Sequence, residues 1–182
     1  MTEAEREIIR EIENSARGNQ KIPASKVKPW LTHPSVEVLG AVNVHIMQNT
    51  RRIEPPLSME EICSTVQEYY RQCLIQNRQD SDYAPNRSLA GLEFVGWFQV
   101  LWRDPAVPRE YVGRLKTMIR DLCVEEKVPQ DQMVGAVLEH LFETPQIAEF
   151  FADWGFDPNL KDAFKQAMEW AKDHRALYRP QA

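Results

Sequence analysis

Residues 128–154 read VPQDQMVGAVLEHLFETPQIAEFFADW, and this stretch decides the fold class. Between Met133 and Phe142 the apolar residues recur every three or four positions, which is the pattern of a helix with one core-facing side. Pro129 and Pro145 each stand at the expected start of a helix, where a residue without a backbone N–H is tolerated. The stretch therefore predicts two consecutive helices, at 129–143 and 145–154.

The same pattern continues through the rest of the chain. Thr2 and Ser58 are each followed three residues later by a glutamate, which is the capping-box pattern of a helix start. Residues 42–46 alternate as a strand would, but no second strand pattern exists to pair with them, so we predict helix there too. The predicted fold class is all-α, a multi-helix bundle or an irregular array of helical hairpins with about eight or nine helices. Helices are expected at residues 3–16, 24–31, 35–49, 58–77, 88–103, 108–126, 129–143, 145–154 and 158–177.

The domain organisation follows from the length and from the connections. A chain of 182 residues suits one helical domain spanning residues 1–182. The sequence leaves open whether the helix at residues 1–17 packs separately, because residues 18–34 form a linker with prolines, lysines and a short helix. Residues 88–103 are apolar almost all round, so we expect a central helix there. Gly91 and Gly96 should let neighbouring backbones approach this helix closely.

Composition and charge narrow the classes of partner. The chain is 43% hydrophobic and 27% charged, as a folded globular protein is, and its net charge is −5. Residues 121–182 hold 6 Lys or Arg against 12 Asp or Glu. An acidic surface matches phosphate backbones poorly, so we do not expect a nucleic acid partner. No apolar run approaches the roughly 18 residues of a membrane span, and no secretory signal is visible. Three cysteines without metal-ligand spacing fit reduced thiols in the cytoplasm.

Catalytic and cofactor motifs are absent from the sequence. It has no nucleophile elbow and no glycine-rich phosphate loop. His140 and Glu143 lie one helical turn apart, but no further ligands accompany them, so we expect no metal and no cofactor. The absence of catalytic motifs favours a protein that is not an enzyme but leaves the question open. One alternative stays open: an enzyme or small-molecule binder with a helical pocket, in which a partly buried glutamate of raised pKa acts as an acid or base. The residues of this pocket would be Glu93, Trp97, Gln99 and Arg103.

The leading functional prediction rests on the acidic, aromatic-rich C-terminal third. It is a helical protein–protein interaction module, such as an adaptor, an assembly factor or a small subunit. Phe151 and Trp154 are predicted to anchor a partner protein, because aromatic rings bury much area with few rotamers to fix. Acidic residues beside them would steer a basic surface into place, namely Glu149, Asp153 and Asp157. An immunity-like or antitoxin-like inhibitor that blocks a basic partner protein is the alternative, and a homo-oligomer is left open.

Overall fold

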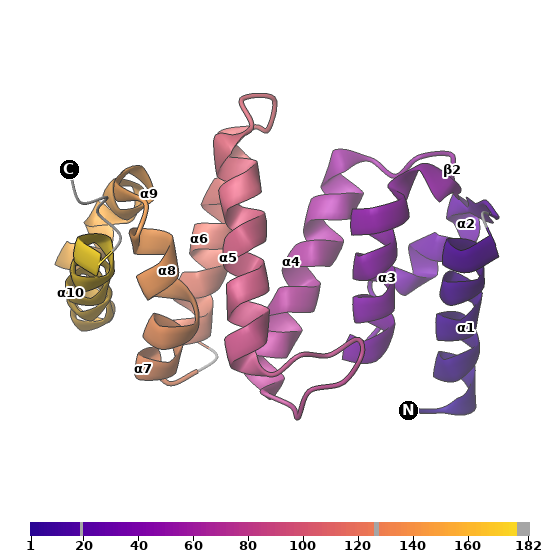
Figure 1. Cartoon of the computed structure of the whole chain (residues 1–182), viewed down its shortest axis with the longest axis horizontal. Helices are drawn as coiled ribbons and strands as arrows, with labels where there is room; N and C mark the ends of the chain where they lie inside the picture. The colour runs from indigo at the N-terminus through magenta and orange to yellow at the C-terminus, as the bar shows by residue number, and fades with distance from the viewer. Residues whose placement is uncertain (19, 126–127, 178–182) are drawn as a thin grey trace. The chain divides into compact units, whose positions relative to one another are not determined.

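The computed structural model describes residues 1–18, 20–125 and 128–177 and is helical through most of them (Figure 1). The all-α fold class is thereby confirmed. Backbone contacts divide the chain into two compact units, Met1–Asn86 and Arg87–Ala182, each of which is described by itself. One domain for residues 1–182 stays a prediction. Over the described residues, no helix is both long enough and apolar enough to cross a bilayer.

In the first unit α3 is the middle helix, packed against α1 and against α4 (Figure 1). Residues 42–46, which alternate as a strand would, are thus helical, as predicted. The N-terminal helix belongs to this unit, because Ile9 and Ile12 lie in the same apolar core as Val38 and Val42. Its elements are α1 (Glu3–Gly18), α2 (Ala24–Val27), a 3₁₀ turn η1 (Lys28–Trp30), α3 (Val36–Asn49), a second turn η2 (Thr50–Arg52) and α4 (Met59–Gln76).

A short parallel strand pair, which the sequence did not predict, completes this unit. β1 (Ile22–Pro23) pairs with β2 (Ile53–Glu54), so that Ile22 lies opposite Ile53 and both side chains are buried. Beside this pair Arg52 donates to the backbone carbonyls of Ser15, at 2.8 Å, and of Ala16. A cation at the last carbonyls of a helix compensates their partial negative charge, so Arg52 ties the end of α1 to the strand pair.

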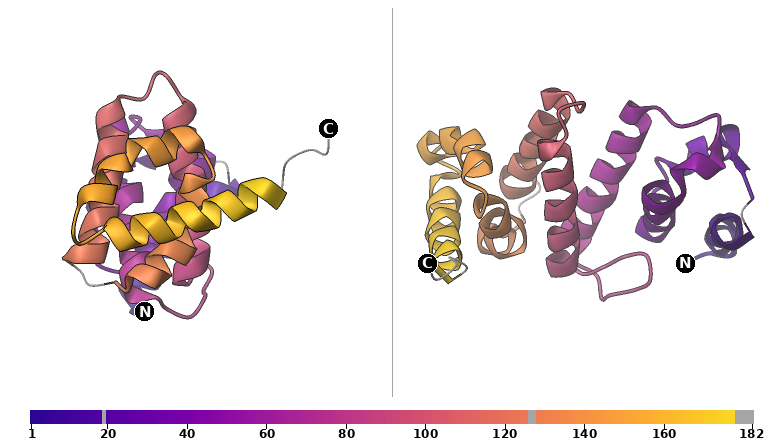
Figure 2. Two further views of the ribbon diagram at one scale, coloured as in Figure 1. Left: turned by 90° about the vertical axis from the view of Figure 1, so that its left-hand side faces the viewer. Right: turned by 45° about the horizontal axis from the view of Figure 1, so that its top comes forward.

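The second unit is built around one helical run, residues 130–142. This run consists of α7 (Gln130–Met133), a π-helical segment η3 (Val134–Leu138) and α8 (Glu139–Phe142), and it confirms the predicted helix at 129–143. It packs against α5 on one side and α10 on the other (Figures 1 and 2). The remaining elements are α5 (Arg87–Arg103), α6 (Arg109–Val124), α9 (Pro145–Phe150), a 3₁₀ turn η4 (Ala152–Phe156) and α10 (Lys161–Leu177).

The prediction for α5 is only partly correct. A Cβ added at Gly91 would overlap the backbone carbonyl of Ala136, so this glycine does permit close approach of η3. A Cβ at Gly96 would have no neighbour within 4 Å, so the same expectation is wrong there. Nor is α5 buried on every side, because its apolar residues Leu89, Leu92 and Val100 are exposed. The most completely buried apolar side chains lie in the 130–142 run instead, where Val137, Leu138, Leu141 and Phe142 are 0% exposed.

The helix starts agree closely with the sequence patterns. Ser58 and Glu61 form a complete capping box at α4, and Thr2 and Glu5 exchange the equivalent bonds at α1. Pro145 occupies the first turn of α9 as predicted, whereas the prolines before α6 and α7 lie one residue earlier, at the N-cap. The predicted end of α6 at Glu126 lies outside the described residues.

Candidate functional site

The two predicted anchor rings point into the core. Phe151 is 0% exposed and Trp154 is 3% exposed, so neither can dock a partner on this surface, and the prediction that they are anchors is wrong. Their ring centroids lie 4.8 Å apart, and Phe151 also contacts Phe142 at 5.5 Å and Phe98 at 6.1 Å. Ile147, Phe151 and Trp154 are spaced four and three residues apart, so they lie on one side of the segment formed by α9 and η4. All three are buried, so this side faces the core.

Of the three predicted acidic residues, two have structural roles. Asp153 pairs with Lys116, whose ammonium also donates to the carbonyl of Phe150 at 2.8 Å. The Asp157 carboxylate accepts from the backbone N–H of Asn159 at 2.8 Å, at the turn that leads into α10. Glu149 is exposed on α9. The carboxylates of Asp153 and Asp157 are thus bound to groups of the second unit itself.

Two other aromatic rings are exposed in the same third of the chain. Phe156, at the end of η4, is 90% exposed, and Trp170, on α10, is 49% exposed. Among the aromatic side chains that the structure describes, these two alone fall in the exposed class. The Trp170 ring meets the His174 imidazole edge-on, with centroids 6.1 Å apart. The sequence contained both residues, but their apolar character alone did not distinguish them from the buried rings.

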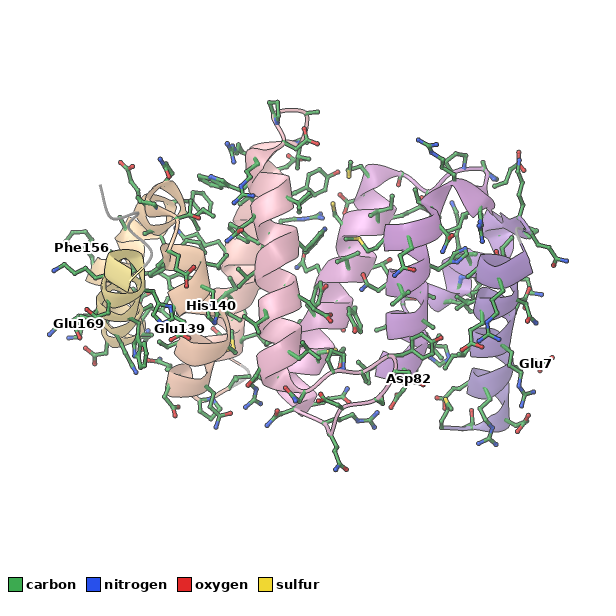
Figure 3. The ribbon with its side chains drawn as sticks, viewed as in Figure 1. Glu7, Asp82, Glu139, His140, Phe156 and Glu169 are labelled. Atoms are coloured by element: carbon green, nitrogen blue, oxygen red, sulfur yellow. The ribbon has the colours of Figure 1, made fainter. Side chains whose placement is uncertain are left out.

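Acidic side chains follow the exposed side of α10 next to Trp170. Asp162, Glu169 and Asp173 are spaced seven and four residues apart, so they share one face of the helix, and all three are exposed. The helix buries its alanines against the unit instead, at positions 163, 167 and 171. Figure 3 shows Phe156 and Glu169 on the outer side of α10, away from α8. We call Phe156, Trp170 and these three acidic residues the α10 face.

A second polar cluster joins α8 to α10. The Nδ1 atoms of His140 and His174 lie 3.4 Å and 3.1 Å from the same carboxylate oxygen of Glu143, and Glu139 lies 3.3 Å from His140 Nε2. Figure 3 shows Glu139 and His140 on the inner side of α10. Sequence reasoning found His140 and Glu143 but missed His174, which is 31 residues further along. Over the described residues, no group of three such side chains is arranged to hold a metal ion.

The residues of the alternative pocket on α5 differ in their exposure. Trp97 is buried, whereas Glu93 and Arg103 are exposed and Gln99 is half-buried. The position beside Gly96 faces open space, because a Cβ added there would have no neighbour within 4 Å. Partial desolvation raises the pKa of the Glu93 carboxyl, but no acceptor or donor in the described residues is aimed at it. The structure therefore gives this pocket no support, and the small-molecule alternative stays a prediction.

Two other sets of reactive side chains, in a groove of the first unit and at the three cysteines, are paired or buried. A groove of about 270 Å³ in the first unit includes Lys28 and Glu61, but these two form an ion pair at 2.8 Å. Hydrogen bonds from Lys28 and Ser58 lower the pKa of the Glu61 carboxyl to about 2. None of the three cysteines forms a disulfide and all three are buried, and burial raises the pKa of the Cys123 thiol to about 12. Such a thiol is a poor nucleophile at neutral pH.

Comparison with known proteins adds nothing to this geometry. No protein-family model, no curated protein sequence and no solved structure matches the chain.

Proposed function

We propose that this chain is a helical protein–protein interaction module that binds a partner with a basic surface through the α10 face. The observation that carries the proposal is the exposure of Phe156 and Trp170, at 90% and 49%. Exposed aromatic rings leave apolar area in water, and a protein partner can remove that area on binding. The proposal keeps the predicted class of function and the predicted acidic third, with Phe156 and Trp170 as anchors in place of Phe151 and Trp154.

The acidic row sets the chemistry of the partner. Asp162, Glu169 and Asp173 form a row along α10 with Trp170 at one edge, and Lys165 and Lys172, four and three residues from Glu169, lie at the other edge. A basic partner surface is attracted to such a row, and lysine or arginine side chains stack favourably on an exposed indole. Because the row is exposed, this attraction should weaken as salt is added.

The test begins with identifying a partner and then measures its affinity in purified form. Wild-type chain and the Phe156→Ala/Trp170→Ala variant are used to capture proteins from the source cells, and a protein lost with the variant is purified. Anchor residues of this kind contribute about 2 kcal/mol or more each, so the double variant should weaken binding by at least 100-fold, as roughly 1.4 kcal/mol corresponds to a factor of ten.

A matched control uses exposed apolar side chains of the first unit. Val44 and Met47 are 36% and 53% exposed on α3, and the Val44→Ala/Met47→Ala variant should bind as the wild type does. The Asp162→Asn/Glu169→Gln/Asp173→Asn variant should bind more weakly at low salt and approach the wild type at high salt. The proposal is wrong if the aromatic variant and the α3 control lose affinity equally, or if the acidic variant binds as well as the wild type at low salt.

A further inference from the structure

We infer that the exposed side of α5 is the interface of a homodimer, in which two copies of this helix cross antiparallel at Gly96. This surface is separate from the α10 face and does not depend on the proposed function. The residues concerned, which we call the α5 stripe, are Leu89, Leu92, Glu93, Gly96, Gln99, Val100 and Arg103.

The α5 stripe combines apolar side chains with a glycine at its centre. Leu92 and Val100 lie four residues before and after Gly96, about 6 Å along the axis in each direction at 1.5 Å per residue. They are 49% and 62% exposed, and Leu89, one turn further out, is 43% exposed. Steps of three and four residues place all of them on one side of the helix. A run of large apolar residues here is more than a solvent-facing helix side needs.

Gly96 has no explanation within its own unit. Its φ is not positive, and a Cβ at this position would have no neighbour within 4 Å. An exposed glycine inside a helix costs about 1 kcal/mol relative to alanine, so neither backbone conformation nor internal packing accounts for it. Gly91 on the same helix differs, because η3 packs directly against it. A second helix crossing at Gly96 would use the missing side chain to approach closely.

The charges select a second copy in an antiparallel arrangement. In a parallel pair Glu93 would face Glu93 and Arg103 would face Arg103, and like charges at close range are unfavourable. In an antiparallel pair centred on Gly96, Leu92 faces Val100 of the partner subunit, and Glu93 faces Gln99 of the partner subunit. Arg103 of the partner subunit then lies about 6 Å further along the axis, within reach of Glu93. Leu89 covers the aliphatic part of the same arginine. Each contact occurs twice, as a two-fold interface requires.

The experiment is sedimentation velocity on the full chain at loading concentrations from about 1 μM to 1 mM. We expect the dissociation constant of the dimer to lie in this range because the interface is small. The wild type should pass from monomer to dimer within this range. Gly96→Gln places a long side chain at the crossing and should weaken dimerisation at least tenfold, which is about 1.4 kcal/mol. Gly113→Gln is the matched control, because Gly113 is also helical with no neighbour within 4 Å of an added Cβ, and it should dimerise as the wild type does.

A charge exchange tests the direction of the pairing. Glu93→Arg should weaken the dimer, because it places a second positive charge within reach of Arg103 of the partner subunit, and Glu93→Arg/Arg103→Glu should restore it. Restoration also shows that the fold accommodates an arginine side chain at position 93. A wild type that stays monomeric up to about 1 mM overturns the inference. So does a Gly96→Gln dimer of unchanged affinity, and failure of the double exchange to restore dimerisation overturns the antiparallel arrangement.

Discussion

Replacing Gly91 by alanine is expected to destabilise the second unit, although alanine is the better helix former. A Cβ at this position would overlap three atoms of Ala136, namely its carbonyl oxygen, its carbonyl carbon and its Cβ. Two of these belong to the backbone of η3 and have no rotamer by which to move away. The added methyl group must therefore push α5 and the 130–142 run apart, in the part of the unit that is most completely buried.

The magnitude follows from two opposing effects. Alanine in place of glycine inside a helix stabilises by about 1 kcal/mol. Inserting a methylene into a packed core costs about 1–3 kcal/mol, and the upper part of this range applies because backbone must move. The net effect should be a loss of about 2 kcal/mol in the free energy of unfolding.

Urea unfolding followed by tryptophan fluorescence measures this loss, since four of the five tryptophans lie in the second unit. Gly113→Ala is the matched control in α6. It meets no neighbour within 4 Å, so it should leave stability unchanged or raise it by up to about 1 kcal/mol. A Gly91→Ala protein as stable as the Gly113→Ala protein would refute the close approach of α5 and η3.

Three further predictions concern other parts of the chain. His45 is 3% exposed, and neither of its ring nitrogens has a hydrogen-bond partner. The pKa of its imidazole is lowered below 6.5, mainly by burial and in addition by the positive charge of Arg52. The unfolded chain then binds a proton more readily, so the stability that His45 contributes above pH 6.5 should be lost as the pH falls below that value. His45→Leu should flatten the pH dependence of the unfolding midpoint, and equal slopes would contradict this. Ser58→Ala removes the N-cap of α4 and should cost about 1 kcal/mol in urea unfolding, whereas Ser64→Ala, in the second turn, should cost much less. Phe151→Ala should destabilise the second unit by about 3–5 kcal/mol, whereas Phe156→Ala should change its stability by less than about 0.5 kcal/mol, and similar losses would mean that their exposures are misassigned.

The positions of the helices could be predicted because the signals for them are local. The three-four apolar spacing, the capping boxes and the prolines act within one or two turns, so residues 129–143 and 58–77 were predicted within a few positions. The strand pair could not be predicted, because Ile22 and Ile53 are far apart in the chain and each strand has two residues. A segment this short gives no alternating pattern.

The candidate site was harder to predict because the direction of each aromatic ring depends on tertiary packing. The segment from Pro145 to Trp154 is apolar on several sides, and only its packing against the rest of the unit decides that the side with Ile147, Phe151 and Trp154 turns inward. Phe156 and Trp170 follow in the same third of the chain, and nothing in their local sequence marks them as exposed. The bond between His174 and Glu143 likewise depends on α10 packing against α8.

Hydroxyl-radical footprinting with residue-resolved mass spectrometry tests the central claim most directly, because it compares two rings that the structure buries with two that it leaves exposed. Phe156 and Trp170 should be oxidised rapidly in the free chain, whereas Phe151 and Trp154 should be protected, and a bound partner should protect Phe156 and Trp170 as well. Rapid oxidation of Phe151 and Trp154, or exposed rings that no bound partner protects, would contradict the account.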